Sequence, residues 1–431
     1  MTEEKSWLGE WTFEVESIGE IKLLGTLSYS PKDKFILEAS IRHASSIKDF
    51  LFLNRISRVK YIIGLDYKTQ KNITLIDCQL SNVNISFNGG SFFRITPTFL
   101  IEGLGYDNTK KPLLFQSLII KYSGLNQWLN SLYQSKINTI GKNKISITYK
   151  RSKSIHCSIN SLLNLSIHFD FSTKHDNSDD TGLFIIDNVS TIFKSKRGQL
   201  DIELFNKYSE HLRRLLQILY YQPAFVLNSI AKKTKDTENY PIYYSQSRTK
   251  NFNNYKLHVG YLSHYRDLVN FPEIIKKWFI FRESDDYTYT TWVASKHLFI
   301  NTPFSEEVFL ENVRVLEVYH KAKYPKPSKR QENNTHLRER IATLLDKLKG
   351  LVDQKAYDNF IINESDFIDI LIANRNYLTH YGENATTSKN ILTVLQLYSY
   401  AVKSRIILLS LLLHDIGIEA KQTFGNLIAR H

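Results

Sequence analysis

Three polar residues close to one another in the sequence, Arg375, Asn376 and His380, can do chemistry together if they lie on a helix. Asn376 and His380 stand four residues apart, so a helix makes their side chains neighbours. Arg375 is rotated from Asn376 by about 100°, but its long side chain can swing toward the same spot. His380 can act as a base or an acid, Arg375 as a charge clamp and Asn376 as a hydrogen-bond donor.

The stretch that must position this trio is SDFIDILIANRNYLTHYG, residues 365–382. Its apolar residues recur with helical period and predict one buried stripe, in which Asn374 is the exception. Gly382 fits the left-handed residue after a helix, which places His380 in the last turn. The helix dipole there favours a charged histidine, whereas Arg375 opposes that charge, and the sequence leaves open which influence wins.

An Arg followed by a His within four to six residues is by itself weak evidence, because chance produces about one or two such pairs in a chain of this size. Four pairs occur: Arg151 with His156, Arg314 with His320, Arg330 with His336, and Arg375 with His380. Only the last pair has an Asn directly after the Arg and lies on a periodic helix with a glycine stop.

Composition predicts a globular protein of two or three domains, with 431 residues and 42% hydrophobic content. Two cysteines, Cys78 and Cys157, make neither a disulfide framework nor a zinc cluster and favour a cytoplasmic setting. The first residues do not resemble a signal peptide. The apolar run at 406–413 is shorter than the roughly 20 residues of a membrane span, so no membrane association is expected.

The net charge of +13 favours polyanions such as nucleic acid, although a compositional excess of lysine explains it equally well. In residues 224–262 aromatic residues lie beside cations. They could stack on single-stranded bases, but a sheet face that packs its own aromatics is the commoner explanation. No glycine-rich phosphate loop is present, which excludes a nucleotide-hydrolysing motor of that type.

The pattern along the chain predicts an α+β multidomain protein. Residues 1–198 are mostly of period two and predict a β-rich N-terminal domain. Residues 199–270 predict a bridging helix that ends before Pro223 and a short β region. Residues 271–431 contain several amphipathic helices with short connections, which predict an antiparallel helical bundle. The acidic loop at 174–182 lacks the spacing of a calcium-binding loop and is read as a solvated turn.

The motif RNYLTH at 375–380 resembles the HEPN superfamily of ribonucleases, whose signature is Arg, a polar residue such as Asn, and His on a helix of a small bundle. Further segments resemble the ApeA-like anti-phage proteins: 122–129, the helix around HLRRLLQIL, 271–279 and VLEVYHK at 315–321. The last helix matches only in general character.

The resemblance implies metal-independent RNA cleavage by Arg375, Asn376 and His380, without a cofactor. It also implies a homodimer or higher oligomer in which two motif helices face each other, because one histidine does not readily perform both proton transfers. By resemblance, Glu317 and His320 take a supporting role, with Glu317 orienting Arg375. A surface salt bridge and an ordinary histidine are the alternative for that pair.

Three hypotheses follow. The first is an HEPN endoribonuclease of a bacterial anti-phage system, whose β-rich domain senses a phage-derived trigger or restrains the bundle. The second is a non-catalytic RNA-binding or sensor protein that uses the bundle for dimerisation. The third is a carbohydrate- or protein-binding β module with a helical oligomerisation tail. His414 with Asp415 resembles a metal dyad, but no further His or Asp group accompanies it, so a helix-end cap is favoured.

Overall fold

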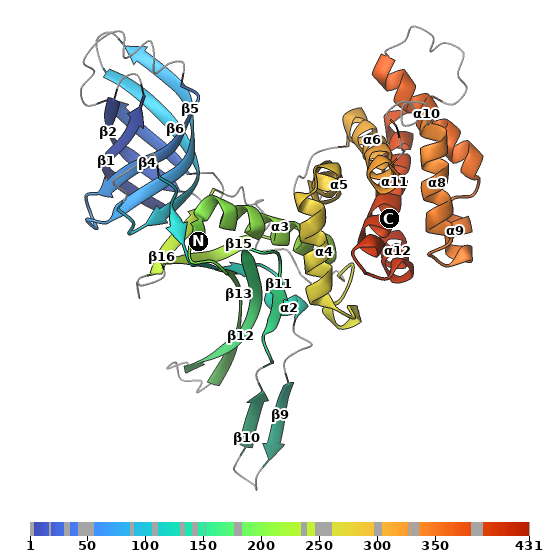
Figure 1. Cartoon of the computed structure of the whole chain (residues 1–431), viewed down its shortest axis with the longest axis horizontal. Helices are drawn as coiled ribbons and strands as arrows, with labels where there is room; N and C mark the ends of the chain where they lie inside the picture. Colours follow the sequence, from blue (N-terminus) through green and yellow to red (C-terminus); the bar gives the residue numbers. More distant parts are fainter. Residues whose placement is uncertain are drawn as a thin grey trace. The chain divides into compact units, whose positions relative to one another are not determined.

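The fold is that of a computed structural model, in which the chain forms two compact units (Figure 1). The first comprises residues 1–123, 161–207 and 225–258, and the second residues 124–160, 208–224 and 259–431. Within these, the structure describes residues 4–16, 19–29, 35–41, 56–86, 90–105, 111–129, 134–139, 145–150, 152–175, 183–233, 239–245, 261–296, 304–325, 328, 336–380 and 391–430.

A six-stranded antiparallel barrel forms the N-terminal part of the first unit. Its strands are β1 (Lys5–Val15), β2 (Gly19–Tyr29), β3 (Ile36–Ile41), β4 (Arg58–Asp66), β5 (Asn72–Ser86) and β6 (Gly90–Glu102). The strand order is β6-β3-β2-β1-β4-β5, and β5 pairs again with β6. This last pairing closes the sheet on itself, so the barrel has no free edge strand.

Strict alternation explains why these strands close around an apolar core. In β1, every second residue from Trp7 to Val15 is buried, namely Trp7, Gly9, Trp11, Phe13 and Val15, while the residues that alternate with them are more exposed. A side chain on Gly64 would lie 2.2 Å from the ring of Trp11, so only glycine admits the indole at that position.

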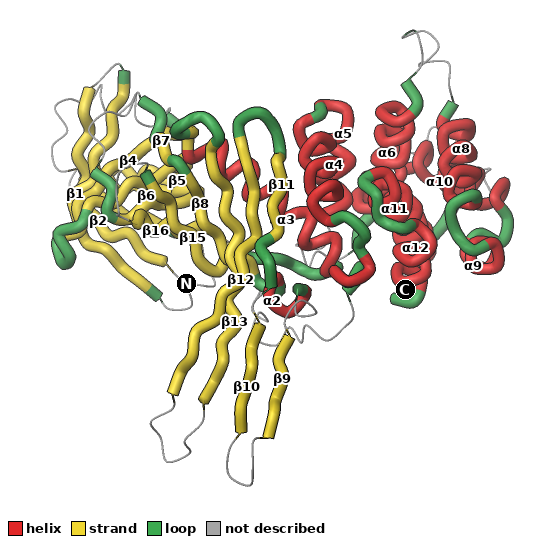
Figure 2. The backbone as a smooth tube through the Cα atoms, turned by 60° about the horizontal axis from the view of Figure 1, so that its bottom comes forward, coloured by secondary structure: helices red, strands yellow, loops and turns green. Residues whose placement is uncertain are grey.

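The second part of this unit continues from β6 into further antiparallel strands. The C-terminal half of β6 pairs with β16 (Asn239–Tyr244), and the order continues through β15 (Val226–Lys232), β8 (Ser117–Tyr122), β13 (Leu183–Ser195) and β12 (Leu163–His175). Figure 2 shows β12 and β13 as long neighbouring strands. A short pair, β7 (Leu114–Phe115) and β14 (Leu200–Asp201), precedes helix α3 (Ile202–Tyr220).

Helices dominate the second unit. They are α4 (Phe271–Glu283), α5 (Asp285–Lys296), α6 (Glu306–Lys323), α8 (Leu337–Lys349), α9 (Gln354–Phe360), α10 (Glu364–His380), α11 (Val394–Asp415) and α12 (Ala420–Ile428). The apolar run at 406–413 forms the centre of α11 and is buried throughout. Helix α11 contacts α5, α6, α8 and α12 (Figure 1). These neighbours cover the apolar run of α11 on all of its sides.

Smaller elements complete the second unit. They are helix α2 (Leu125–Trp128), strands β9 (Gln134–Thr139), β10 (Ile145–Lys150) and β11 (Ile155–Ser158), and a 3-10 turn at Tyr265–Asp267. Strands β9 and β10 form an antiparallel hairpin (Figure 2). Trp128 of α2 donates its indole N–H to the carbonyl of Ser263 at 2.8 Å, which anchors this short helix.

The predicted fold class is confirmed, with a β-rich N-terminal part followed by a helical region. Helix α3 ends at Tyr220, before Pro223 as expected, and belongs in part to each unit. The division into 1–198, 199–270 and 271–431 stays a prediction. The strand expected at KLHVGY and most of the acidic loop at 174–182 lie outside the described residues.

Candidate active site

Helix α10 presents its apolar side to the bundle and its polar side outward. Phe367, Leu371 and Leu378 are buried as the apolar stripe predicted, and Asn374, the polar exception in that stripe, is only 1% exposed. Tyr377, expected in the stripe, is instead exposed. The helix contacts α8 and α6, so its orientation within the bundle is set by these apolar residues.

Two members of the predicted trio meet on the outer side of α10. Arg375 is half-buried, and its Nη1 donates to Oδ1 of Asn376 at 3.1 Å. Asn376 itself is exposed. The Arg side chain therefore swings toward its neighbour, as its length allows. His380 is the last residue of α10, one turn beyond Asn376, but its side chain and Gly382 lie outside the described residues.

Asn374 positions the end of α10, although in the sequence it stands out only as a polar exception in the apolar stripe. Its Nδ2 donates to the carbonyl of Ile370 at 2.8 Å, and its Oδ1 accepts the backbone N–H of Leu392, also at 2.8 Å. The chain enters α11 directly after Leu392, at a capping box formed by Thr393 and Gln396. One buried amide thus ties the C-terminal part of α10 to the start of α11, next to Arg375.

Glu317 and His320 both lie on α6, which contacts α10. Glu317 pairs with Lys321 of the same helix at 2.7 Å, while Arg375 bonds to Asn376. The expected orienting contact between these two described side chains, Glu317 and Arg375, is therefore not formed. His320 is buried, and its ring centroid lies 5.1 Å from that of Tyr324. This arrangement agrees with the simpler alternative of a surface salt bridge and an interior histidine.

Asp415, considered for a metal dyad with His414, instead joins two helices. It accepts the hydroxyl of Tyr319 and the ammonium of Lys323, both at 2.7 Å, which links the end of α11 to α6. Burial, together with the charge of Asp415, raises the pKa of Tyr319 far above its usual range, so the phenol stays a donor. Among the described residues, no group of three or more His, Cys, Asp or Glu side chains could hold a metal ion.

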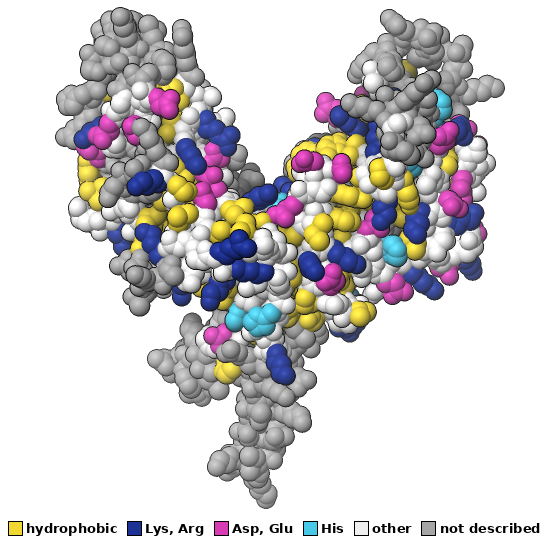
Figure 3. All heavy atoms as spheres, in the orientation of Figure 1, with side chains coloured by type: hydrophobic (Ala, Val, Ile, Leu, Met, Phe, Trp, Pro, Cys, Tyr) yellow, Lys and Arg dark blue, Asp and Glu magenta, His cyan; other side chains and the backbone are white. Residues whose placement is uncertain are grey.

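Basic and acidic side chains are interspersed over the visible face of the second unit (Figure 3). Several bases are paired: Lys349 with Glu364 at 3.2 Å and Arg338 with Asp369 both connect α8 to α10. Exposed pairs of this kind each contribute about 0–1 kcal/mol. Apolar packing, rather than these ion pairs, therefore holds α10 in place.

An exposed apolar surface lies at the start of α11. Leu395 is 83% exposed, and Val394 and Tyr398 are about half exposed. The ring of Phe304 packs edge-on against Tyr398 with centroids 5.3 Å apart. Through the bond between Asn374 and Leu392, this apolar surface adjoins the helix that carries Arg375 and Asn376.

A β-rich N-terminal part and a helical bundle that carries Arg-Asn-x3-His on one helix define a two-part protein with an HEPN-type domain. Family comparisons agree. Residues 6–278 match the ApeA N-terminal domain 1 and residues 310–422 match the Apea-like HEPN domain, so the chain belongs to the ApeA-like family of HEPN anti-phage proteins. Comparison with curated proteins and with solved structures finds no match.

Helix α10, with Arg375 and Asn376, lies inside the segment that matches the HEPN domain. No helix in the described part of the chain is long and apolar enough to cross a membrane.

Proposed function

We propose that this chain is a metal-independent endoribonuclease of a bacterial anti-phage system. A ribose 2′-OH attacks the adjacent phosphate, the P–O5′ bond breaks, and the products are a 2′,3′-cyclic phosphate and a 5′-OH. The observation that supports this proposal most is the bonded pair of Arg375 and Asn376, which faces outward near the end of α10 within the HEPN match.

Each side chain has a role in this reaction. Arg375 neutralises the charge that builds up on the phosphate oxygens in the transition state, because a guanidinium keeps its charge and offers several donors. Asn376 orients Arg375 and can also donate from its amide to the phosphate. His380 accepts the proton of the 2′-OH or donates one to the leaving 5′ oxygen.

A second copy of the chain completes the site in this proposal. The two proton transfers need a base and an acid at once, and a two-fold dimer brings two copies of His380 together. The exposed apolar surface of Val394, Leu395 and Tyr398 supports this arrangement, because soluble proteins seldom leave such residues clustered without a partner. It adjoins the motif helix, where a dimer interface must lie if both copies share one site.

The β-rich N-terminal region takes the sensing or restraining role. It would respond to a phage-derived trigger, while the helical region cuts RNA. Its closed barrel offers a rigid outer surface for recognition, whereas the reaction needs only residues of α10.

Incubation of the purified chain with RNA in excess EDTA tests the reaction. The proposal predicts undiminished cleavage, 5′-OH ends, and 3′ ends that resist a phosphatase until acid opens the cyclic phosphate. Activity that requires a divalent cation, or 5′-phosphate ends, would contradict it. Both outcomes are read from labelled RNA on the same gel.

A non-catalytic RNA-binding or sensor protein that dimerises through the bundle is the alternative. Burial of Arg375 in an ion pair within the chain would favour it. In the structure Arg375 is only half-buried and bonds to the neutral amide of Asn376. This observation supports the nuclease over the scaffold.

A further inference from the structure

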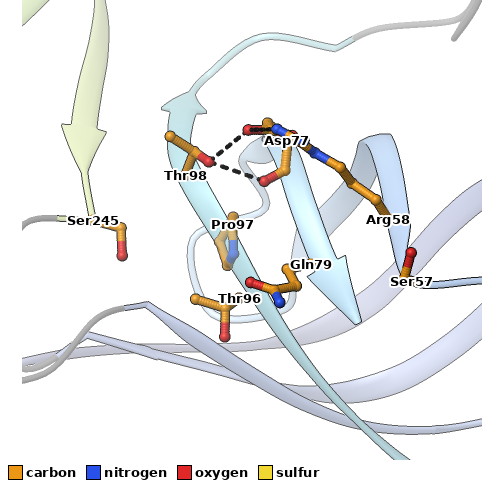
Figure 4. A pocket seen from close by; sticks show the side chains of 8 residues that line it. All are labelled: Ser57, Arg58, Asp77, Gln79, Thr96, Pro97, Thr98 and Ser245. Atoms are coloured by element: carbon orange, nitrogen blue, oxygen red, sulfur yellow. Dashed lines mark hydrogen bonds and ion pairs between the residues drawn. The ribbon is translucent and has the colours of Figure 1, made fainter. Parts of the chain in front are cut away.

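A polar groove lies on the outer side of the barrel, where β4, β5 and β6 meet (Figure 4). Two concavities of about 480 Å³ and 530 Å³ share Arg58, Asp77 and Thr98 in their linings. In Figure 4, Asp77 lies between Arg58 and Thr98, while Ser57 and Ser245 stand on opposite sides. The volumes fall within the range of sites that hold small molecules or short peptide segments, roughly 300–1,000 Å³.

The floor of this groove breaks two rules of regular strands. Asp77, inside β5, has φ of 55°, a left-handed backbone that is unusual for any residue but glycine. Pro97, inside β6, brings no N–H to the ladder. Neither the β4–β5 nor the β5–β6 ladder forms a pair at Asp77, although the register is the same on both sides of it. Such strain costs about 1–3 kcal/mol and concentrates at sites that bind ligands.

The surroundings of Asp77 hold it in this conformation. Arg58 donates to both carboxylate oxygens, through Nε to Oδ1 and through Nη2 to Oδ2 at 2.6 Å. The hydroxyl of Thr98 bonds to Oδ2 at 2.8 Å and to the carbonyl of Asp77 at 3.1 Å. The hydrogen bonds from Arg58 keep the pKa of Asp77 below its usual value, so the carboxylate is charged at neutral pH.

This pairing leaves one edge of the Arg58 guanidinium facing away from Asp77. A guanidinium has two edges that each offer two parallel N–H donors, and Asp77 occupies the edge of Nε and Nη2. The side chain of Arg58 is 69% exposed, against 33% for Asp77. The edge of Nη1 and Nη2 is therefore a fork for a second carboxylate, held in a fixed direction by the first.

The charges of the groove restrict what can bind beside that fork. Lys60, two residues along β4, pairs with Glu203 at 3.3 Å and lines the same groove. The two cations and two anions of the lining give the groove no net charge. A groove without net positive charge does not favour the binding of a polyanion such as RNA. The remaining polar lining consists of hydroxyls and amides, which donate to and accept from peptide groups: Ser57, Gln79, Thr96, Ser245 and Asn206.

We propose that this groove binds an acidic peptide segment of a partner protein, with one Asp or Glu carboxylate on the free edge of Arg58. Hydroxyls and amides of the groove bind the peptide backbone beside it. This site gives a chemical class to the trigger in the sensing role proposed above. It does not depend on the nuclease assignment, because binding is measured without RNA cleavage.

Fluorescence anisotropy with three labelled probes tests the site on the full chain: a Ser- and Gly-rich peptide with one central Glu, its Gln-for-Glu counterpart, and oligo(U) RNA. We expect the acidic peptide to bind about tenfold more tightly than the neutral one. Arg58→Lys keeps the charge and a partner for Asp77 but loses the fork, and we expect it to weaken binding several-fold. The double variant R58Q/D77N removes both charges and should weaken binding by about tenfold or more.

Lys71→Gln is the matched control, because Lys71 is an exposed cation of the same barrel that pairs with Glu102 at 2.8 Å. It should bind the acidic peptide as the unmodified chain does. Circular dichroism establishes that each variant is folded, and Arg58→Lys carries the test if R58Q/D77N is not. Equal binding of both peptides, no peptide binding, or unchanged binding in Arg58→Lys would overturn the proposal. Displacement of the acidic peptide by oligo(U) would overturn it in favour of a nucleic-acid contact.

Discussion

The polar residues on α10 and those in the barrel groove differ in how many contacts hold them. Within the described residues, the side chain of Arg375 makes one hydrogen bond, to its exposed neighbour Asn376. Arg58 and Asp77 lock each other through two bonds, and a threonine fixes the carboxylate from the other side. The groove is thus fully formed within one chain, whereas the end of α10 offers donors without a fixed target.

The two sites therefore differ in what they need before they can act. Because Asp77 already holds Arg58 in place, the other edge of the guanidinium can bind a ligand without rearrangement. This lowers the entropy that is lost on binding. The α10 residues need a phosphate, a second copy, or both before their geometry is defined.

The largest effect should come from the motif itself. Arg375→Ala and His380→Ala should each lower RNA cleavage by at least about a hundredfold, because each removes a group that acts on the transition state. The melting temperature should change by no more than a few degrees, since the hydrogen bond that the structure describes for the Arg375 side chain is to exposed Asn376. Cleavage assays and thermal melts are run side by side.

Arg338→Ala and His336→Ala are the matched controls for these two variants. Arg338 pairs with Asp369 at the surface, and His336 lies just before α8 in another Arg–His pair of similar spacing. Both variants should cleave RNA normally. Retained cleavage in Arg375→Ala or His380→Ala would rule out the proposed site.

Leu395→Asp should separate the copies and reduce cleavage with them. It puts a charge in the middle of the exposed apolar surface at the start of α11, where burial against a second copy would be costly. Light scattering should show a monomer, and activity should fall to a small fraction. Ile362→Asp, at an exposed apolar residue just before α10, should alter neither property. A monomeric Leu395→Asp chain with full activity would contradict the proposal that two copies of the chain form one site.

Asn374→Ala should lower both stability and activity. The variant loses the bonds from Asn374 to the carbonyl of Ile370 and to the half-buried N–H of Leu392, at a cost of about 1–3 kcal/mol in the free energy of unfolding. Cleavage at a temperature where the variant is folded should fall about tenfold, because α10 and α11 lose their tie beside Arg375.

Asn312→Ala is the control for this variant. Asn312 is equally buried and makes the same backbone bond, Nδ2 to the carbonyl four residues earlier, at 2.7 Å on α6. It should lose stability but keep activity per folded molecule. Equal losses of activity in both variants would assign Asn374 to general packing.

Strong periodicity made much of the fold predictable. The alternation of β1 and the apolar stripe of α10 appear where the sequence predicts them, because one face of each is buried. Helix α5 was not foreseen. Its segment DDYTYTTWVASK is rich in β-branched and aromatic residues, which have low helix propensity, and only packing against α4 and α6 makes it helical.

The two sites differ in the same way. Spacing on one helix was enough to bring Arg375 to Asn376, since neighbours in sequence need no tertiary information. The groove depends on strand pairing between residues far apart, such as Arg58 and Asp77, and on a left-handed backbone that Asp adopts without a sequence signal. In the sequence, Pro97 is a local irregularity within one of these strands. Pairing of Glu317 with Lys321 rather than Arg375 likewise depends on packing that the sequence does not give.

The smallest effect that we expect is on the stability of the chain at acidic pH, through the pair of Arg58 and Asp77. The paired carboxylate of Asp77 has a pKa below its unfolded value of about 3.9, so its contribution to stability is present above that pH and is lost as pH falls through the folded pKa. The stability advantage of the unmodified chain over R58Q/D77N should therefore shrink below about pH 4. Urea unfolding at several pH values measures it. A constant difference would show that the pair contributes by shape alone.

In the proposed mechanism two copies of the chain form one RNA-cleaving site, and a titration of the unmodified chain with His380→Ala chain tests this arrangement. The two are co-refolded or co-expressed so that mixed dimers form, and cleavage is measured per unmodified chain. A mixed dimer holds one His380 in place of two, so activity should fall toward zero as the variant is added in excess. Unchanged activity per unmodified chain would contradict the claim, because each copy would then cleave RNA alone.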